Sequence, residues 1–333
     1  MVLWGKSGVN PRGAQAMSGR EPTSRDRDDR VLPFAVEALD VRGRLARLGP
    51  ALDAIFRCHA YPPPIARAVG EAVVLGVLLG STLKADGRLQ LQTKTDGPLN
   101  MIVVDFDAPD RLRAFARFAP DVLPEALTTG ELLGSGHFAL TIEDLRSDSR
   151  YQGVVPVSGQ GLEQAAHEYF TQSEQIPTFV RLAVARDITA QGVHWRGGGL
   201  LLQFLPSSPA RLHQADLASG DAPPGAVLRR EAEDDAWTEA KALATTLEDD
   251  ELVDPGLPSE TLLYRLFHER GVSVFDVHPV RSQCRCSTAR IDRMLRSFSA
   301  QERADMIDAR GRIAVTCEFC STERDFEPGG LER

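Results

Sequence analysis

Four of the five cysteines in this 333-residue chain form two close pairs toward its C-terminal end. Cys284 and Cys286 are separated by one residue, and Cys317 and Cys320 by two. The thirty residues between the pairs can fold into a compact insert that brings the four sulfurs together. Four cysteine sulfurs about 2.3 Å from a metal, at the corners of a tetrahedron, are typical of a structural zinc site. We therefore predict that these four cysteines bind one Zn²⁺ ion.

Two other interpretations of the cysteines stay open. Unpaired structural thiols are one, although close pairs at both ends of an insert are more typical of a metal site. Static disulfides are the other, but they are typical of secreted proteins, and the first residues lack the apolar run of a secretion signal. We therefore expect a cytoplasmic protein. A Cys-x-Cys pair also suits redox chemistry, because adjacent thiolates can oxidise to a disulfide and so release a metal.

The insert between the pairs has the signals of a small folded unit. Ser299 and Glu302 have the spacing of a capping box that begins a helix, and Gly311 can end that helix. Residues 312–316 then predict a short strand that leads into the second pair. Because structural zinc supplies about 10–16 kcal/mol to small modules, we expect loss of the metal to unfold this one.

Other residues that could do chemistry have simpler explanations. Cys58, the fifth cysteine, is expected to be an ordinary packed thiol, since free cysteine is commonly buried. His268 and His278 lie near the cysteines in sequence, but four sulfurs already complete a tetrahedral site. Residues 134–136 lack the rest of a phosphate-binding loop. A thiol oxidoreductase using Cys317 and Cys320 would need a βαβ context that the sequence lacks. We predict no catalytic residue and no enzyme activity.

The patterns along the rest of the chain predict an α+β fold divided into a tail, an N-terminal domain, a linker and a C-terminal module. Residues 1–28 have almost no apolar periodicity and are predicted to form a disordered tail. Residues 29–217 alternate strand and helix patterns and predict an N-terminal domain of mixed sheets and helices. Residues 218–280 carry acidic clusters and prolines and predict a metastable helical linker. Residues 281–333 form the zinc-binding module.

Within the N-terminal domain, apolar residues from 65 to 83 recur at spacings of three and four and predict a core helix that begins after a run of prolines. Residues 43–56 predict a short helix, and residues 161–171 another. Alternating and β-rich runs predict strands at residues 31–36, 88–93, 101–106, 138–142, 153–157, 180–185 and 200–205. In the linker, residues 236–247 predict a helix whose thin apolar face needs docking for stability.

Charge bounds the choice of partner. The net charge of −9 disfavours a phosphate backbone as the main ligand, and the longest apolar run, residues 72–83, is too short to span a bilayer. Residues 281–316, however, contain eight arginines against four acidic residues. A zinc-ribbon nucleic-acid-binding protein is therefore the alternative function, less favoured because the rest of the chain is acidic. We expect no membrane partner.

Over about residues 31–326, the chain resembles the redox-regulated heat-shock chaperones known as 33 kDa chaperonins. The two cysteine pairs carry this resemblance together with several motifs, at residues 70–72, 89–92, 96–99, 151–155, 169–170, 172–177, 198–200, 203 and 266–269. The chain departs from the family pattern in its long N-terminal tail and at residues 321–326, where the expected aromatic near Arg324 is missing.

The resemblance implies an ATP-independent holdase that prevents aggregation of unfolding client proteins, with the N-terminal domain in contact with clients. It implies a reduced, inactive monomer with one Zn²⁺ bound. In the oxidised, active homodimer, disulfides would join Cys284 to Cys286 and Cys317 to Cys320, with zinc released and the linker unfolded. It also implies a role in the cytoplasm under oxidative and heat stress.

Overall fold

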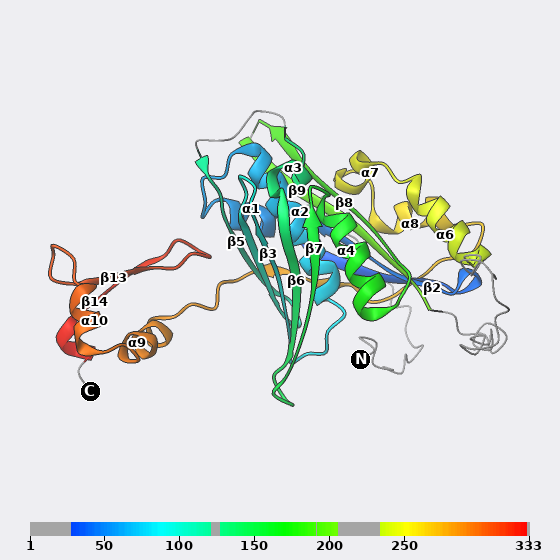
Figure 1. Ribbon diagram of the computed structural model, residues 1–333. Coiled ribbons are helices and arrows are strands. Elements are labelled where there is room, and N and C mark those ends of the chain that lie inside the picture. Colours follow the sequence, from blue (N-terminus) through cyan, green and yellow to red (C-terminus); the bar gives the residue numbers. More distant parts are fainter. Residues whose placement is uncertain (1–27, 121–126, 191, 206–233, 332–333) are drawn as a thin grey trace, which may run out of the picture.

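The computed structural model describes residues 28–120, 127–190, 192–205 and 234–331, so the predicted tail lies outside the described residues except for Asp28. Within these ranges the strands form two six-stranded sheets and one two-stranded hairpin. Helices pack between the sheets and beside them, and the cysteine-bearing C-terminal part lies at the opposite end of the molecule from the linker helices (Figure 1). This is the α+β fold that the sequence predicts.

Sheet A is antiparallel and joins segments that are far apart in the chain. Its strand order is β10-β1-β2-β9-β8, and β11 also pairs with β1. The bounds are β1 Arg30–Val36, β2 Val41–Leu48, β8 Thr178–Thr189, β9 Gly192–Phe204, β10 Ser273–Val274 and β11 His278–Pro279. The strands predicted at residues 31–36 and 180–185 are confirmed within β1 and β8, and the one predicted at 200–205 is confirmed up to Phe204, where β9 ends. The end of the predicted linker region thus runs back along the edge of sheet A.

The short helix predicted over residues 43–56 is wrong in its first half. β2 continues to Leu48, and α1 (Pro50–Phe56) begins only after Gly49, with a proline at its first position. β2 pairs with β1 on one side and β9 on the other, so two ladders of backbone hydrogen bonds fix it as a strand. Arg44 and Arg47 are both buried in it, and charged residues at core positions conceal the strand pattern.

Sheet B contains the strands nearest to the cysteines. Its order is β12-β5-β4-β3-β6-β7, in which only the β12–β5 pair among the described strands is parallel. The bounds are β3 Gly87–Thr95, β4 Met101–Asp107, β5 Arg111–Arg117, β6 Ser135–Asp144, β7 Ser149–Ser158 and β12 Arg281–Ser282. The strands predicted at residues 88–93, 101–106, 138–142 and 153–157 are confirmed. Since β12 directly precedes Cys284, sheet B sets the position of the first cysteine pair.

The core helix α2 (Pro63–Gly80) lies between the two sheets and is buried on nearly all sides. Glycines allow this close approach: a Cβ on Gly80 would lie 2.4 Å from the Phe106 ring of sheet B, and one on Gly199 of sheet A would lie 2.5 Å from Val74 of α2. The helix ends three residues before Leu83, the last residue of the predicted pattern. α2 is long and apolar enough to cross a membrane, but 78% of its apolar window is buried inside the protein, as in a core helix.

Two shorter helices complete the N-terminal domain. α3 (Thr129–Leu133) begins with a capping box between Thr128 and Glu131. α4 (Leu162–Tyr169) confirms the helix predicted at residues 161–171 and continues into a π-helical turn, Phe170–Glu174.

The linker helices α6 (Asp235–Thr245), α7 (Asp249–Val253) and α8 (Ser259–Phe267) dock on sheet A. Trp237 is buried there with Phe204, and the rings of Phe34 and Phe267 lie 5.9 Å apart. The helix predicted at residues 236–247 is confirmed. Its narrow apolar face packs on sheet A, as expected for a helix that needs docking for stability.

Two arginines of sheet A, buried Arg47 and half-buried Arg196, also hold α7 by its C-terminal carbonyl groups. Arg47 of β2 donates to the carbonyl oxygens of Glu251 and Asp254, at 2.7 and 2.5 Å. Arg196 of β9 donates to the carbonyl of Val253 at 2.7 Å and forms an ion pair with Asp28. Cations at a helix C-terminus satisfy its free carbonyl groups and interact favourably with its dipole.

The C-terminal module contains α9 (Thr288–Arg296), α10 (Ala300–Asp305), the hairpin β13 (Ile313–Thr316) and β14 (Glu323–Phe326), and a final turn, Pro328–Leu331. The capping box of Ser299 and Glu302 is confirmed, as is the strand before the second cysteine pair. Gly311 does not end α10, which stops at Asp305; it lies at φ +78° in the turn before β13. The module has a small apolar core, formed by Ile291, Leu295, Ile313 and Phe326 with Val315 packed against it.

Candidate metal centre

The four cysteines lie on two short segments, and a backbone hydrogen bond holds each segment in place. Cys284 and Cys286 occupy the extended chain between β12 and α9, where the amide of Gln283 donates to the carbonyl of Leu112 at 2.9 Å. Cys317 and Cys320 lie in the turn of the β13–β14 hairpin, which is closed by the Cys317 amide donating to the carbonyl of Thr322 at 3.1 Å. One pair is therefore positioned by sheet B and the other by the module's own hairpin.

The sulfur atoms form one compact group. All four Sγ atoms lie within 4.8 Å of one another, with 3.7 Å between Cys284 and Cys317 and 3.4 Å between Cys286 and Cys320. A tetrahedron with metal–sulfur bonds of about 2.3 Å has edges of about 3.8 Å, so the group is close to the required size. The separations are far longer than a disulfide bond of about 2.05 Å, and the thiols are free. The group could hold a metal ion, with neither His268 nor His278 in it.

The thiols differ in acidity. Burial raises the pKa of Cys286 to about 12, with hydrogen bonds from neighbouring thiols adding to the rise, and burial also raises the pKa of Cys317. Burial opposes ionisation of Cys320 too, but hydrogen bonds from Thr322 outweigh it and lower the pKa of Cys320 to about 6. These hydrogen bonds thus favour the thiolate form of Cys320. Further thiolates in so small a volume repel one another unless a cation offsets their charge.

The cysteine turn rests on the N-terminal domain through an aromatic residue. The ring of Phe319, between Cys317 and Cys320, meets Phe115 of β5 edge-on at 4.7 Å between centroids. The guanidinium of Arg113 lies over the same ring at 3.7 Å and is 3.9 Å from the sulfur of Cys284. Arg113 therefore places a positive charge beside both cysteine pairs.

A second contact involves the end of α1. His59 Nε2 lies 3.3 Å from the carbonyl oxygen of Phe319, and Ser321 donates to the carbonyl of Cys58 at 2.6 Å. The thiol of Cys58 itself donates to the carbonyl of Ala54 at 3.3 Å, and burial together with the nearby sulfurs raises its pKa. Cys58 is a half-buried thiol at a helix end, next to the metal-binding group but outside it.

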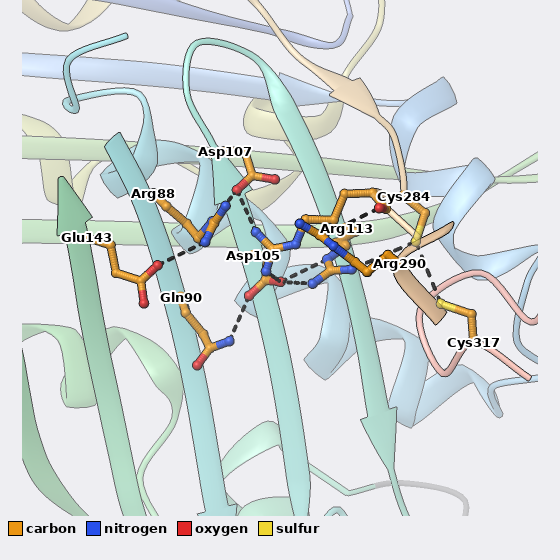
Figure 2. Close-up of polar contacts among 10 residues, drawn as sticks. Arg88, Gln90, Asp105, Asp107, Arg113, Glu143, Cys284, Arg290 and Cys317 are labelled. Atoms are coloured by element: carbon orange, nitrogen blue, oxygen red, sulfur yellow. Dashed lines mark hydrogen bonds and ion pairs between the residues drawn. The ribbon is translucent and has the colours of Figure 1, made fainter. Parts of the chain in front are cut away.

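The third contact is a row of ion pairs on sheet B. Asp105 and Asp107 project from the same face of β4, because residues two apart in a strand share a face. Asp105 is paired with Arg113 at 2.5 Å and Asp107 with Arg88 at 2.5 Å, and Figure 2 shows these side chains in one group beside Cys284. Arg285, between the first two cysteines, donates to Asp107 at 2.8 Å and to Asp105 at 2.9 Å. The backbone of the first cysteine pair is thereby tied to the centre of sheet B.

Sequence reasoning found the four cysteines but missed the residues that dock them. The carboxylates and arginines of sheet B lie about 180 positions from Arg285, and nothing in the local pattern joins them. A signal was present in the alternation of β3 and β4, where charged and polar residues at 88, 90, 105 and 107 share one face of neighbouring strands. Phe319 carried no signal, since any aromatic between two cysteines could equally pack inside the module.

Comparison with known proteins places the chain in a family. The family model described as "Hsp33 protein" matches residues 29–327. The 33 kDa chaperonin of Caulobacter vibrioides is 43% identical over 91% of this chain and 96% of its own length, and that of Nitrosococcus oceani is 34% identical over 92% and 93%. The crystal structure of the 33 kDa chaperonin from Thermotoga maritima has the same fold, with a TM-score of 0.71 at 18% identity over 91% of this chain and 97% of its own. The chain belongs to the Hsp33 family.

Proposed function

We propose that this protein is a redox-regulated, ATP-independent holdase that prevents aggregation of unfolding or oxidatively damaged proteins. In the reduced, inactive form, Cys284, Cys286, Cys317 and Cys320 hold one Zn²⁺ ion. The observation that carries the proposal is the compact group of four free sulfurs, whose separations match a tetrahedral thiolate site. Thiolates favour Zn²⁺ over hard cations such as Mg²⁺ or Ca²⁺. The chaperone activity is supported by the family to which the chain belongs.

Oxidation would act directly on the residues that hold the module together. When bound, the zinc ion supplies a charge that keeps all four sulfurs as thiolates and joins the two segments. A peroxide oxidises one thiolate to a sulfenic acid, a second cysteine attacks that sulfur, water leaves, and a disulfide forms. Each disulfide removes two ligands, and the module's apolar core of four residues is too small to fold alone.

The family resemblance implies disulfides between sequence neighbours, and unfolding of the module is compatible with that pairing. In the folded group, sulfurs of different segments lie close together: Cys284 is 3.7 Å from Cys317, and Cys286 is 3.4 Å from Cys320. Once the module opens, each cysteine keeps one partner within three positions of it in the chain, whereas thirty residues separate the two pairs. We therefore propose disulfides between the sequence neighbours, Cys284 with Cys286 and Cys317 with Cys320.

The linker helices would respond to the loss of the module. They lead into it through β10, β11 and β12, and their own stability depends on apolar packing against sheet A. Undocking of α6 or α8 would expose large apolar side chains on both surfaces, which is the kind of surface that binds unfolded clients. We propose a reduced monomer, an oxidised homodimer and a cytoplasmic location.

The alternative, a nucleic-acid-binding zinc ribbon, is weakened by the state of the module's arginines. Five of the eight in residues 281–316 have acidic partners: Arg281 with Asp110, Arg285 with Asp105, Arg296 with Asp292, Arg310 with Asp308 and Arg312 with Glu327. Nucleic-acid binding gains free energy when lysine or arginine neutralises phosphates and releases their bound counterions. An arginine already paired with a carboxylate contributes less to this gain. Tight nucleic-acid binding with a steep salt dependence would nonetheless favour this function.

The decisive experiment measures metal content and client protection on the same sample. Reduced protein is expected to hold one zinc per chain and to leave aggregation of a heat-denatured test protein unchanged by light scattering. Peroxide with mild heat is expected to release the zinc and to suppress scattering, and reductant with zinc to reverse both. Cys286→Ser is expected to lower zinc affinity, whereas Cys58→Ser, the matched control outside the group, is expected to switch normally. Unchanged scattering after confirmed zinc loss would contradict the chaperone function.

A further inference from the structure

The ion pairs around Arg285 form a charge-balanced group that includes one residue of the metal-binding loop. Three carboxylates, from Asp105, Asp107 and Glu143, face three guanidinium groups, from Arg88, Arg113 and Arg285. Gln90 adds a neutral hydrogen bond to Asp105 at 2.9 Å. All of these residues except Arg285 belong to sheet B, so without Arg285 the charged members of this group, three carboxylates against two guanidinium groups, carry one negative charge in excess.

Burial makes that excess charge costly. The side chain of Asp105 is 1% exposed and that of Asp107 is 10% exposed. A buried carboxylate that loses one of its cationic partners loses charge-assisted hydrogen bonds that water cannot fully replace. The N-terminal sheet therefore favours the conformation in which Arg285 is inserted.

Arg285 reaches both carboxylates from the short segment between β12 and α9. It has a cysteine of the metal-binding group on each side, so binding of a metal by Cys284 and Cys286 fixes the chain at both flanks. The adjacent segment is tied to β5 by two hydrogen bonds, from the amide of Arg281 to Asp110 and from that of Gln283 to Leu112, at 2.7 and 2.9 Å. Metal binding and docking on sheet B thus share a single loop.

We propose that Arg285 is the positioning residue that couples the metal centre to the N-terminal domain, docking the module on sheet B only while both flanking cysteines are ligated. This inference rests on the proposed function, because it specifies how the state of the metal reaches the rest of the chain. Loss of the metal frees the loop, Arg285 withdraws from Asp105 and Asp107, and β12 separates from β5. The module then leaves the sheet before the linker helices undock.

The test uses full-length, reduced, zinc-loaded protein and hydrogen–deuterium exchange at the amides of Arg281 and Gln283, which report the pairing of β12 with β5. Arg285→Ala is expected to retain one zinc per chain while these amides exchange about 10- to 100-fold faster, the effect of losing charge-assisted hydrogen bonds. Arg310→Ala, the matched control, removes exposed ion pairs within the module and is expected to leave this exchange unchanged. Arg285→Lys is expected to fall between Arg285→Ala and the unaltered protein, because one ammonium group cannot bond both carboxylates as a guanidinium does.

Coupling to the metal is distinguished from simple stabilisation by repeating the comparison without zinc. A positioning residue has little effect once the loop is already free, so Arg285→Ala and the unaltered protein are expected to exchange alike in the metal-free state. A difference that persists without zinc would overturn the coupling. Equal exchange of Arg285→Ala and the unaltered protein with zinc bound would overturn the docking role.

A variant of the N-terminal domain keeps the test valid if Arg285→Ala disturbs the metal site itself. Asp107→Asn removes one acceptor charge from sheet B without altering the cysteine loop, and it is expected to give the same faster exchange with zinc retained. Failure of this variant to speed exchange would overturn the proposal. These readouts do not use client protection, so an inactive but normally coupled protein would count against the proposed function alone.

Discussion

The linker helices and the four-cysteine module both dock on the N-terminal domain, but through different chemistry. The linker is held mainly by apolar packing, with Trp237 and Phe267 buried against sheet A. The module is held by ion pairs and hydrogen bonds around Arg285 and by the single ring of Phe319. Its own apolar core of buried residues has only four members. The two regions therefore differ in what their release would expose to water.

Release of the module exposes charged groups, which water solvates well. Release of the linker exposes apolar surface, and exposing such surface to water costs a free energy of about 25 cal/mol per Å². A switch needs one region that can leave readily and another whose departure creates a binding surface. Under the proposed function, the chemistry of docking would suit the module to sensing and the linker to client binding. Predictions that separate the two docking modes can test this division.

The largest expected effect is that of metal removal. A strong chelator under reducing conditions is expected to unfold the module, because structural zinc contributes about 10 kcal/mol or more to such folds. Hydrogen exchange should show loss of protection in α9 and β13 while α2 stays protected. If the module keeps its protection without metal, its small core is sufficient and the comparison fails.

The next effect concerns the apolar docking of the linker. Trp237→Ala is expected to destabilise the docked linker by about 3–5 kcal/mol, because it removes a large buried side chain. Faster proteolysis of α6 and increased binding of a hydrophobic dye should follow, with zinc content unchanged. Tyr264→Ala is the control, since Tyr264 lies on α8 with 62% of its surface exposed. Loss of zinc from Trp237→Ala would mean that linker and module do not undock in the proposed order.

Predictions from the sequence were correct where the interacting residues are close together in the chain. The cysteine pairs and the capping box of Ser299 and Glu302 are local patterns, and they predicted that the four cysteines lie together and where α10 starts. The helix at residues 236–247 was predicted by composition, with its need for docking deduced from its thin apolar face. Its partner surface could not be predicted, because sheet A is assembled from strands distant in the chain.

The failures had a common cause in charged residues whose partners are remote. The helix predicted over residues 43–56 was wrong where Arg44 and Arg47 lie buried in β2, and Arg47 is buried because it binds carbonyl groups of α7, more than 200 residues away. Asp105 is likewise buried because Arg113 and Arg285 surround it, and nothing in its own strand indicates these partners. Tertiary ion pairs override the hydrophobic pattern on which such predictions depend.

A smaller effect is expected at the aromatic contact of the module. Phe319→Ala removes the edge-on contact with Phe115 and the cation–π contact with Arg113, together about 1–2 kcal/mol. Faster exchange at the β12–β5 amides is expected, with zinc stoichiometry unchanged. Met306→Ala, a partly exposed apolar residue of the same module, should leave exchange unaltered. A loss of zinc in Phe319→Ala would show that the ring builds the metal site rather than docking it.

The smallest effect is expected at an exposed ion pair between the module and sheet B, which can be compared with the buried ion pairs of Arg285. Arg117 and Glu318 form an ion pair across the same interface at 2.5 Å, but their side chains are 56% and 54% exposed. Exposed pairs contribute about 0–1 kcal/mol, because water screens them and two long side chains lose freedom. Arg117→Ala is therefore expected to leave exchange at the β12–β5 amides within about threefold of the unaltered protein, far below the effect of Arg285→Ala. If the two variants undock the module equally, burial of Asp105 and Asp107 is not what makes Arg285 decisive, and long-range charge attraction would hold the module instead.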